Sequence, residues 1–140
     1  MIDEASENKL LNENAKEAER VIQVLRDSMN GTIMPAFERG AQFDPKFFEW
    51  FSQISSKFCF PDGKALPAKY RALIHICLLA NRGMINGLAT RIKMAIEEHG
   101  ASKLEIVEAL ETAMVEGGAP TLFNGLTGLM LYEERKKQKA

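Results

Sequence analysis

Apolar residues recur every three or four positions along most of the chain, which is the period of an amphipathic helix. The first such segment predicts a helix over residues 8–29, which Asn30-Gly31 ends because these residues tolerate a positive φ. Residues 34–40 follow as a connector with room for one helical turn. Alternating β-branched residues, which mark a strand, are missing, so the pattern predicts an all-α fold of about six helices.

Two proline-containing pairs mark the start of later helices. Asp44-Pro45 predicts a helix start, because an Asp side chain caps free N–H groups and proline suits the first helical position. Leu66-Pro67 opens another helix that runs to about Asn81. The composition of residues 61–63, Pro-Asp-Gly, predicts a turn between the two. The first of these helices is unusually aromatic, with Phe47, Phe48, Trp50, Phe51, Ile54 and Phe58.

Glycines and a cap divide the second half of the chain. Gly83 separates the helix that ends near Asn81 from the next one, predicted over about 84–98. Ser102 and Glu105 have the spacing of a capping box, in which each side chain satisfies a backbone donor of the other residue. Residues 117–118, Gly-Gly, end that helix, and residues 119–120, Ala-Pro, begin the last one.

Two apolar surfaces exceed what a small bundle covers easily. One is the aromatic face at 47–58, and the other is the Gly-rich last helix with its apolar residues Phe123, Leu126, Leu129, Met130 and Leu131. Both suggest contacts between subunits, and hence a homo-oligomer. The alternative is that these faces fill the core of one monomer.

Composition and charge exclude several classes of protein. A chain of 140 residues supports one domain, and its net charge of −1 argues against nucleic-acid binding. Two cysteines cannot form a disulfide-stapled scaffold or a four-cysteine zinc site, and a mixed site would have only His75 and His99 to complete it. We expect no metal, and we expect no cofactor. No secretory signal precedes the first helix, and the longest apolar run, 72–80, is too short to cross a bilayer. We therefore expect a cytoplasmic protein without a membrane segment.

Four segments in order resemble the carboxymuconolactone decarboxylase and alkylhydroperoxidase D-like family. They are residues 44–56, then 66–71 (Leu-Pro-Ala-Lys-Tyr-Arg), then 95–110 with Ala-Ile-Glu-Glu-His-Gly-Ala-Ser at its start, and finally 117–120 (Gly-Gly-Ala-Pro) with Asn124. The resemblance implies an all-α fold with a central helical hairpin, assembled as a trimer, a hexamer or a similar ring. It also implies that 44–132 is the family core of a single 1–140 domain, with 1–43 as an N-terminal helix and connector and 133–140 as a charged tail.

The family's redox chemistry falls on residues that this chain has replaced. Peroxidase members of the family carry Cys-x-x-Cys-x-x-x-His after the glycine and a Glu in the preceding helix. Here the two cysteine positions are Met84 and Gly87, the histidine position is Arg91, and the glutamate position is Ala72. Neither a thioether nor a glycine supplies a thiolate, and Arg cannot act as a base. The resemblance thus implies that thiol peroxidase activity by the family mechanism is absent.

Two residues remain as candidates for a site. Arg91 could hold a carboxylate bidentately, which suits an anionic organic acid or lactone; otherwise it forms a surface or interface salt bridge. His75 lies one helical turn after Ala72 and could act as the acid/base group; otherwise it is a core histidine bonded to the backbone. Cys77 and Cys59 lack the short redox spacing, and Cys77 has the pattern of a small buried residue.

Two classes of function stay open at this point. One is an enzyme of the carboxymuconolactone decarboxylase-like type, a lyase, with His75 and Arg91 in a rebuilt site for a small carboxylate or lactone. The other is a non-catalytic oligomer that binds a ligand or a protein through its apolar faces.

Overall fold

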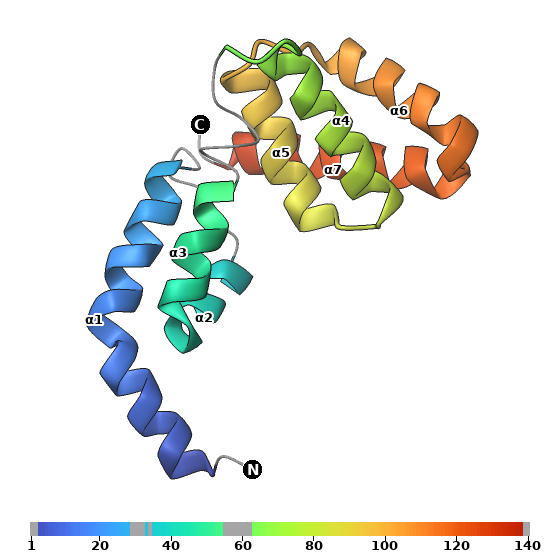
Figure 1. Cartoon of the computed structure of the whole chain (residues 1–140). Coiled ribbons are helices and arrows are strands. Elements are labelled where there is room, and N and C mark those ends of the chain that lie inside the picture. Colours follow the sequence, from blue (N-terminus) through green and yellow to red (C-terminus); the bar gives the residue numbers. More distant parts are fainter. Residues whose placement is uncertain (1–2, 29–32, 34, 55–62, 139–140) are drawn as a thin grey trace. The chain divides into compact units, whose positions relative to one another are not determined.

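The computed structural model of the chain describes residues 3–28, 33, 35–54 and 63–138 (Figure 1). These residues form seven α-helices and no strand, which confirms the all-α prediction. The chain divides into two compact units, Met1–Pro61 and Asp62–Ala140. The first unit contains α1 (Glu4–Ser28), α2 (Pro35–Phe43) and α3 (Pro45–Gln53); the second contains α4 (Ala68–Asn81), α5 (Ile85–Glu97), α6 (Lys103–Gly117) and α7 (Ala119–Lys137).

The first unit is held by a small core between its three helices. Val21 and Leu25 of α1 and Ala41 of α2 are fully buried, and Phe37 and Phe48 pack against them. The start of α3 is the predicted cap: the Asp44 side chain accepts a hydrogen bond from the backbone N–H of Phe47 at 2.9 Å. Helix α2 differs from the prediction. The sequence pattern predicts a connector over residues 34–40, whereas the structure has a helix of nine residues there.

The second unit is organised around α7. Helix α7 contacts α4, α5 and α6, and Figure 1 shows it crossing behind α4 and α5. Two glycines bring it close to its neighbours: a Cβ on Gly125 would lie 2.3 Å from Leu110 of α6, and one on Gly128 would lie 2.6 Å from Leu88 of α5. The core of the unit includes Ile76, Ile92 and Ile106, each with no exposed surface. This packing leaves α4 and α5 as an antiparallel pair lying on α7.

The boundaries of these helices follow the predicted signals. Gly83, with φ of 67°, lies in the turn between α4 and α5, where a positive φ favours glycine. The capping box before α6 is present: Ser102 Oγ accepts from the Glu105 N–H at 3.1 Å, and the Glu105 carboxylate accepts from the Ser102 N–H at 2.8 Å. Helix α7 begins at Ala119-Pro120 directly after Gly118, as predicted.

Apolar side chains remain exposed in both units. In α3, Phe47 and Trp50 are 48% and 59% exposed, and in α7, Phe123 and Met130 are 64% and 60% exposed. These belong to the two surfaces for which subunit contacts are predicted. Within the described residues, no helix has both the length and the apolar character needed to cross a membrane.

Candidate functional site

The α4–α5 hairpin carries both candidate residues. His75 lies in the middle of α4 and Arg91 in the middle of α5, each eight positions from Gly83 in the turn. In an antiparallel pair of helices, residues equally distant from the turn lie at the same level. The charge of Arg91 acts on His75, where it is the second cause of a lowered pKa. Both are half-buried.

His75 is held in its neutral form. Partial burial and, after it, the positive charge of Arg91 lower the pKa of His75 from 6.5 to about 4. The imidazole is therefore uncharged at neutral pH and has a nitrogen lone pair that can accept a proton or a hydrogen bond. The hairpin thus places a neutral proton acceptor, His75, near a permanently charged cation, Arg91.

Arg91 is oriented by its own helix. Its Nη1 lies 3.5 Å from the Met94 Sδ, one turn further along α5, and Met94 is itself buried. A guanidinium presents five N–H donors in a planar fork that matches a carboxylate, and the thioether is a weak acceptor. The group is chemically suited to an anionic oxygen ligand.

The four positions that the sequence resemblance aligns with the family's relay are spread over the same hairpin. Met84, Gly87 and Arg91 follow one another at helical spacing along one side of α5, with Met84 exposed at the N-terminal cap and Gly87 buried. Ala72 is 3% exposed and belongs to the core of the unit. Of these four side chains only that of Arg91 is charged, so it is the one that can bind an anion directly.

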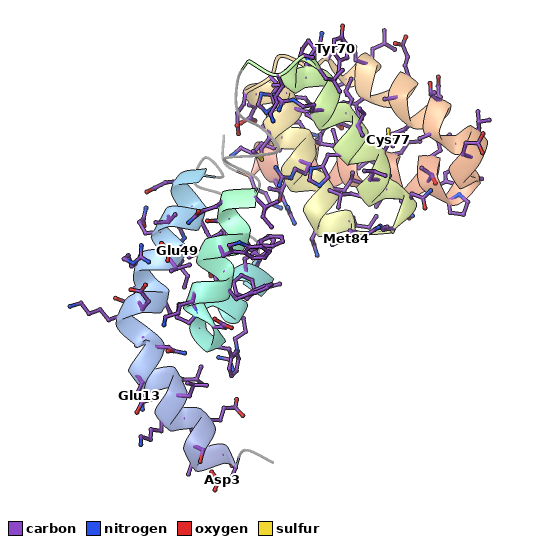
Figure 2. All side chains as sticks on the ribbon, in the orientation of Figure 1. Asp3, Glu13, Glu49, Tyr70, Cys77 and Met84 are labelled. Atoms are coloured by element: carbon purple, nitrogen blue, oxygen red, sulfur yellow. The ribbon has the colours of Figure 1, made fainter. Side chains whose placement is uncertain are left out.

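The thiol lies on the other side of α4. Cys77 Sγ donates a hydrogen bond to the backbone carbonyl of Ala109 in α6 at 3.4 Å, and Figure 2 shows Cys77 on the side of α4 toward α6. Burial raises the pKa of the Cys77 thiol, so it stays protonated at neutral pH. Cys59 lies outside the described residues. Across the described ranges, no group of three or more His, Cys, Asp and Glu side chains is placed to hold a metal ion.

Several residues that fix the hairpin have roles that the sequence analysis did not assign. Asn124 of α7 donates from Nδ2 to the carbonyl of Ala80 at 2.9 Å, at the end of α4. Tyr132, which is 4% exposed, donates to the Glu97 carboxylate at 3.1 Å at the end of α5. In the sequence, Asn124 and Tyr132 each place a polar group at helical spacing among the apolar positions of α7. That pattern is the signal that could have indicated these contacts. They hold both ends of the hairpin against α7.

Comparison with known proteins gives one informative result. No family model matches the sequence, and no curated protein matches it. A solved structure from Burkholderia xenovorans LB400, provisionally called a carboxymuconolactone decarboxylase, is similar, with a TM-score of 0.73 and 23% sequence identity. The similarity covers 86% of this chain and 95% of that one.

At this identity the comparison establishes the fold. The chain has a carboxymuconolactone decarboxylase-like fold, as the resemblance in its sequence predicts.

Proposed function

We propose that the protein binds a small organic carboxylate or lactone between α4 and α5, with Arg91 as the anchor and His75 as the proton carrier. The observation that supports this most directly is that Arg91 is close enough to contribute to the lowered pKa of a half-buried, neutral His75. We further propose that it acts in the cytoplasm as a homo-oligomer, a trimer or a hexamer, as the family resemblance implies.

The two residues have complementary tasks in this proposal. A guanidinium holds a carboxylate through two parallel N–H donors, while a neutral imidazole accepts a proton from the bound molecule. An anion bound at Arg91 offsets the positive charge that lowers the pKa of His75. Binding would therefore raise the pKa of His75 from about 4 by the smaller of its two causes, while the larger cause, burial, would remain.

Thiol peroxidase chemistry is not part of the proposal. The positions of the family's two cysteines hold Met84 and Gly87, and Cys77 is a protonated thiol bonded to a carbonyl on the side of α4 toward α6. None of these groups provides a thiolate beside His75.

A non-catalytic oligomer that binds a ligand or a protein is the second candidate. The replaced positions favour it, because all four residues of the family's thiol and proton relay are changed in this chain. His75 is the one group that we propose to compensate for them. This second candidate is also favoured by the exposed apolar residues of α3 and α7, which a binding module would cover.

Thermal unfolding in the presence of small dicarboxylates and lactones tests ligand binding. A ligand at 100 times its Kd stabilises the native state by about 2.7 kcal/mol, or roughly 5–10 °C in Tm for a chain of this size. We expect such a shift in the wild type and its loss in Arg91→Ala. The matched control is Lys93→Ala, which removes a positive charge from the same helix two residues further on, about 200° around the helix axis. Equal stabilisation of wild type and Arg91→Ala would contradict the anchor.

Turnover of a stabilising compound separates the two candidate functions. If the protein is an enzyme, His75→Gln keeps the thermal shift and loses conversion of the compound, as followed by NMR. If it is a binding module, the wild type shows the shift and converts nothing.

A further inference from the structure

The first unit contains a groove between α1 and α2 that the proposed function does not use. Helix α2 runs back along α1, because Arg26 of α1 pairs with Glu38 near the start of α2 and Asn14 of α1 donates from Nδ2 to the carbonyl of Phe43 at its end. The groove between the two helices has a volume of about 200 Å³. Pockets for drug-sized molecules begin at about 300 Å³, so the groove suits a small ligand.

The floor of the groove is apolar, and the sizes of its side chains shape it. Four residues on one face of α1 form this floor: Leu11, Ala15, Ala18 and Ile22. The two small alanines lie between the larger Leu11 and Ile22, so the hollow lies above the alanines. Leu11 and Ile22 are eleven residues apart in the sequence, which is about 16 Å along a helix. A floor of this length fits an extended alkyl chain.

Arg39 of α2 brings a positive charge to the groove. Its Cζ lies 4.4 Å from the centroid of the Phe43 ring, and its Nη1 donates to Gln42 Oε1 at 2.9 Å. The ion pairs of the described residues do not include Arg39. The aromatic ring and the neutral amide thus hold the guanidinium in place without neutralising its charge. A planar guanidinium at the edge of an apolar groove is suited to a carboxylate.

Glu19 also lines the groove and limits the charge that a ligand can carry. Its side chain is exposed, and the ion pairs of the described residues do not include it. A carboxylate next to Glu19 would be repelled, because like charges placed side by side are unfavourable. The lining therefore favours a ligand with one carboxylate over a ligand with two.

We propose that the groove between α1 and α2 binds a free alkyl monocarboxylate of about the size of octanoate. Its chain lies on the alanine floor and is removed from water there, while its carboxylate binds Arg39. Gln42 also lines the groove, and its amide provides further N–H donors for the same carboxylate. The site belongs to the first unit alone, so it does not depend on the function proposed for the α4–α5 hairpin.

Saturation-transfer NMR of octanoate tests the groove on the full chain. For a ligand of this size we expect a Kd of about 0.1–1 mM. Ala15→Leu fills the hollow and is expected to abolish saturation transfer to the alkyl chain. The matched control, Ala36→Leu, makes the same change on α2 outside the groove and is expected to bind like the wild type. Both alanines are exposed and leucine is a good helix former, so circular dichroism should show an unchanged fold.

Two charge changes test the assignment of the carboxylate. Arg39→Gln should weaken octanoate binding several-fold, whereas Lys16→Gln, which removes a positive charge of α1 outside the groove, should leave it unchanged. Octanedioate has the same chain length and a second carboxylate, so it should bind more weakly than octanoate, and Glu19→Gln should reduce this difference. Octanedioate that binds the wild type as tightly as octanoate does would overturn the assignment to a monocarboxylate.

The site in the groove and the site proposed at Arg91 can fail separately. Arg91→Ala should bind octanoate like the wild type. No saturation transfer at about 10 mM octanoate, or equal transfer in the wild type, Ala15→Leu and Arg39→Gln, would overturn the groove as a site. Loss of octanoate binding in Arg91→Ala alone would also overturn the groove, and it would leave the proposed function standing. Failure of the Arg91 anchor itself appears in the thermal shifts with dicarboxylates and lactones.

Discussion

The two sides of α4 carry ionisable groups in different electrostatic environments. Toward α5, His75 is half-buried beside the cation Arg91, and its pKa is lowered to about 4. Toward α6, Cys77 donates to a backbone carbonyl, and burial raises the pKa of its thiol. Both groups are uncharged at neutral pH, but the proposed carboxylate ligand would change the pKa of His75 alone, because an anion offsets the charge of Arg91.

This difference shows why the number of cysteines is a poor guide to chemistry here. A thiol becomes a nucleophile when nearby positive charge or a helix N-terminus stabilises the thiolate. The positive charge of Arg91 acts on the His75 side, whereas Cys77 donates to a carbonyl oxygen, which favours the protonated thiol. This is why the proposed proton carrier is His75 and not Cys77.

The largest expected effect comes from removing the core that both sides of α4 share. Ile76 has no exposed surface, so Ile76→Ala should lower the free energy of unfolding by about 2–5 kcal/mol, measured by urea denaturation. The matched control, Val115→Ala, changes a residue that is 76% exposed on α6 and should stay within about 0.5 kcal/mol of the wild type. Equal losses in the two variants would show that α4 is not packed as described.

A smaller effect concerns the Cys77 side. Because its thiol is half-buried and its pKa is raised, Cys77 should react with an alkylating reagent more slowly than free cysteine at pH 8. Mass spectrometry of the peptide that contains Cys77 gives the rate without interference from Cys59. Alkylation as fast as that of free cysteine would mean that the thiol is not held against Ala109.

Much of the fold could be predicted from local signals. The Asp44 cap, the capping box at Ser102 and the turn at Gly83 each act within a few residues, so the sequence shows them directly. Helix α2 could not be predicted in the same way. It is nine residues long, and residues distant in the sequence hold it, since Ala41 shares a core with Val21 and Leu25 of α1.

The candidate site was predictable in part. Sequence reasoning selects His75 and Arg91 one at a time, and their pairing follows from a hairpin whose turn lies midway between them. The exposure of Ile74 and Leu78 on α4 could not be predicted from the sequence. Ile74 and Leu78 follow the same apolar pattern as buried residues, and only the packing of α5, α6 and α7 shows that no helix of this unit covers them.

The direct test of the central claim is an NMR titration of the His75 ring in the wild type and in Arg91→Gln. We expect a pKa of about 4 in the wild type, a higher value in the variant, and a rise in the wild type when a carboxylate binds. Since the folded-state pKa is depressed, this group's contribution to stability is present above pH 6.5 and is lost as the pH falls toward 4. A wild-type pKa near 6.5 that Arg91→Gln leaves unchanged would contradict the account.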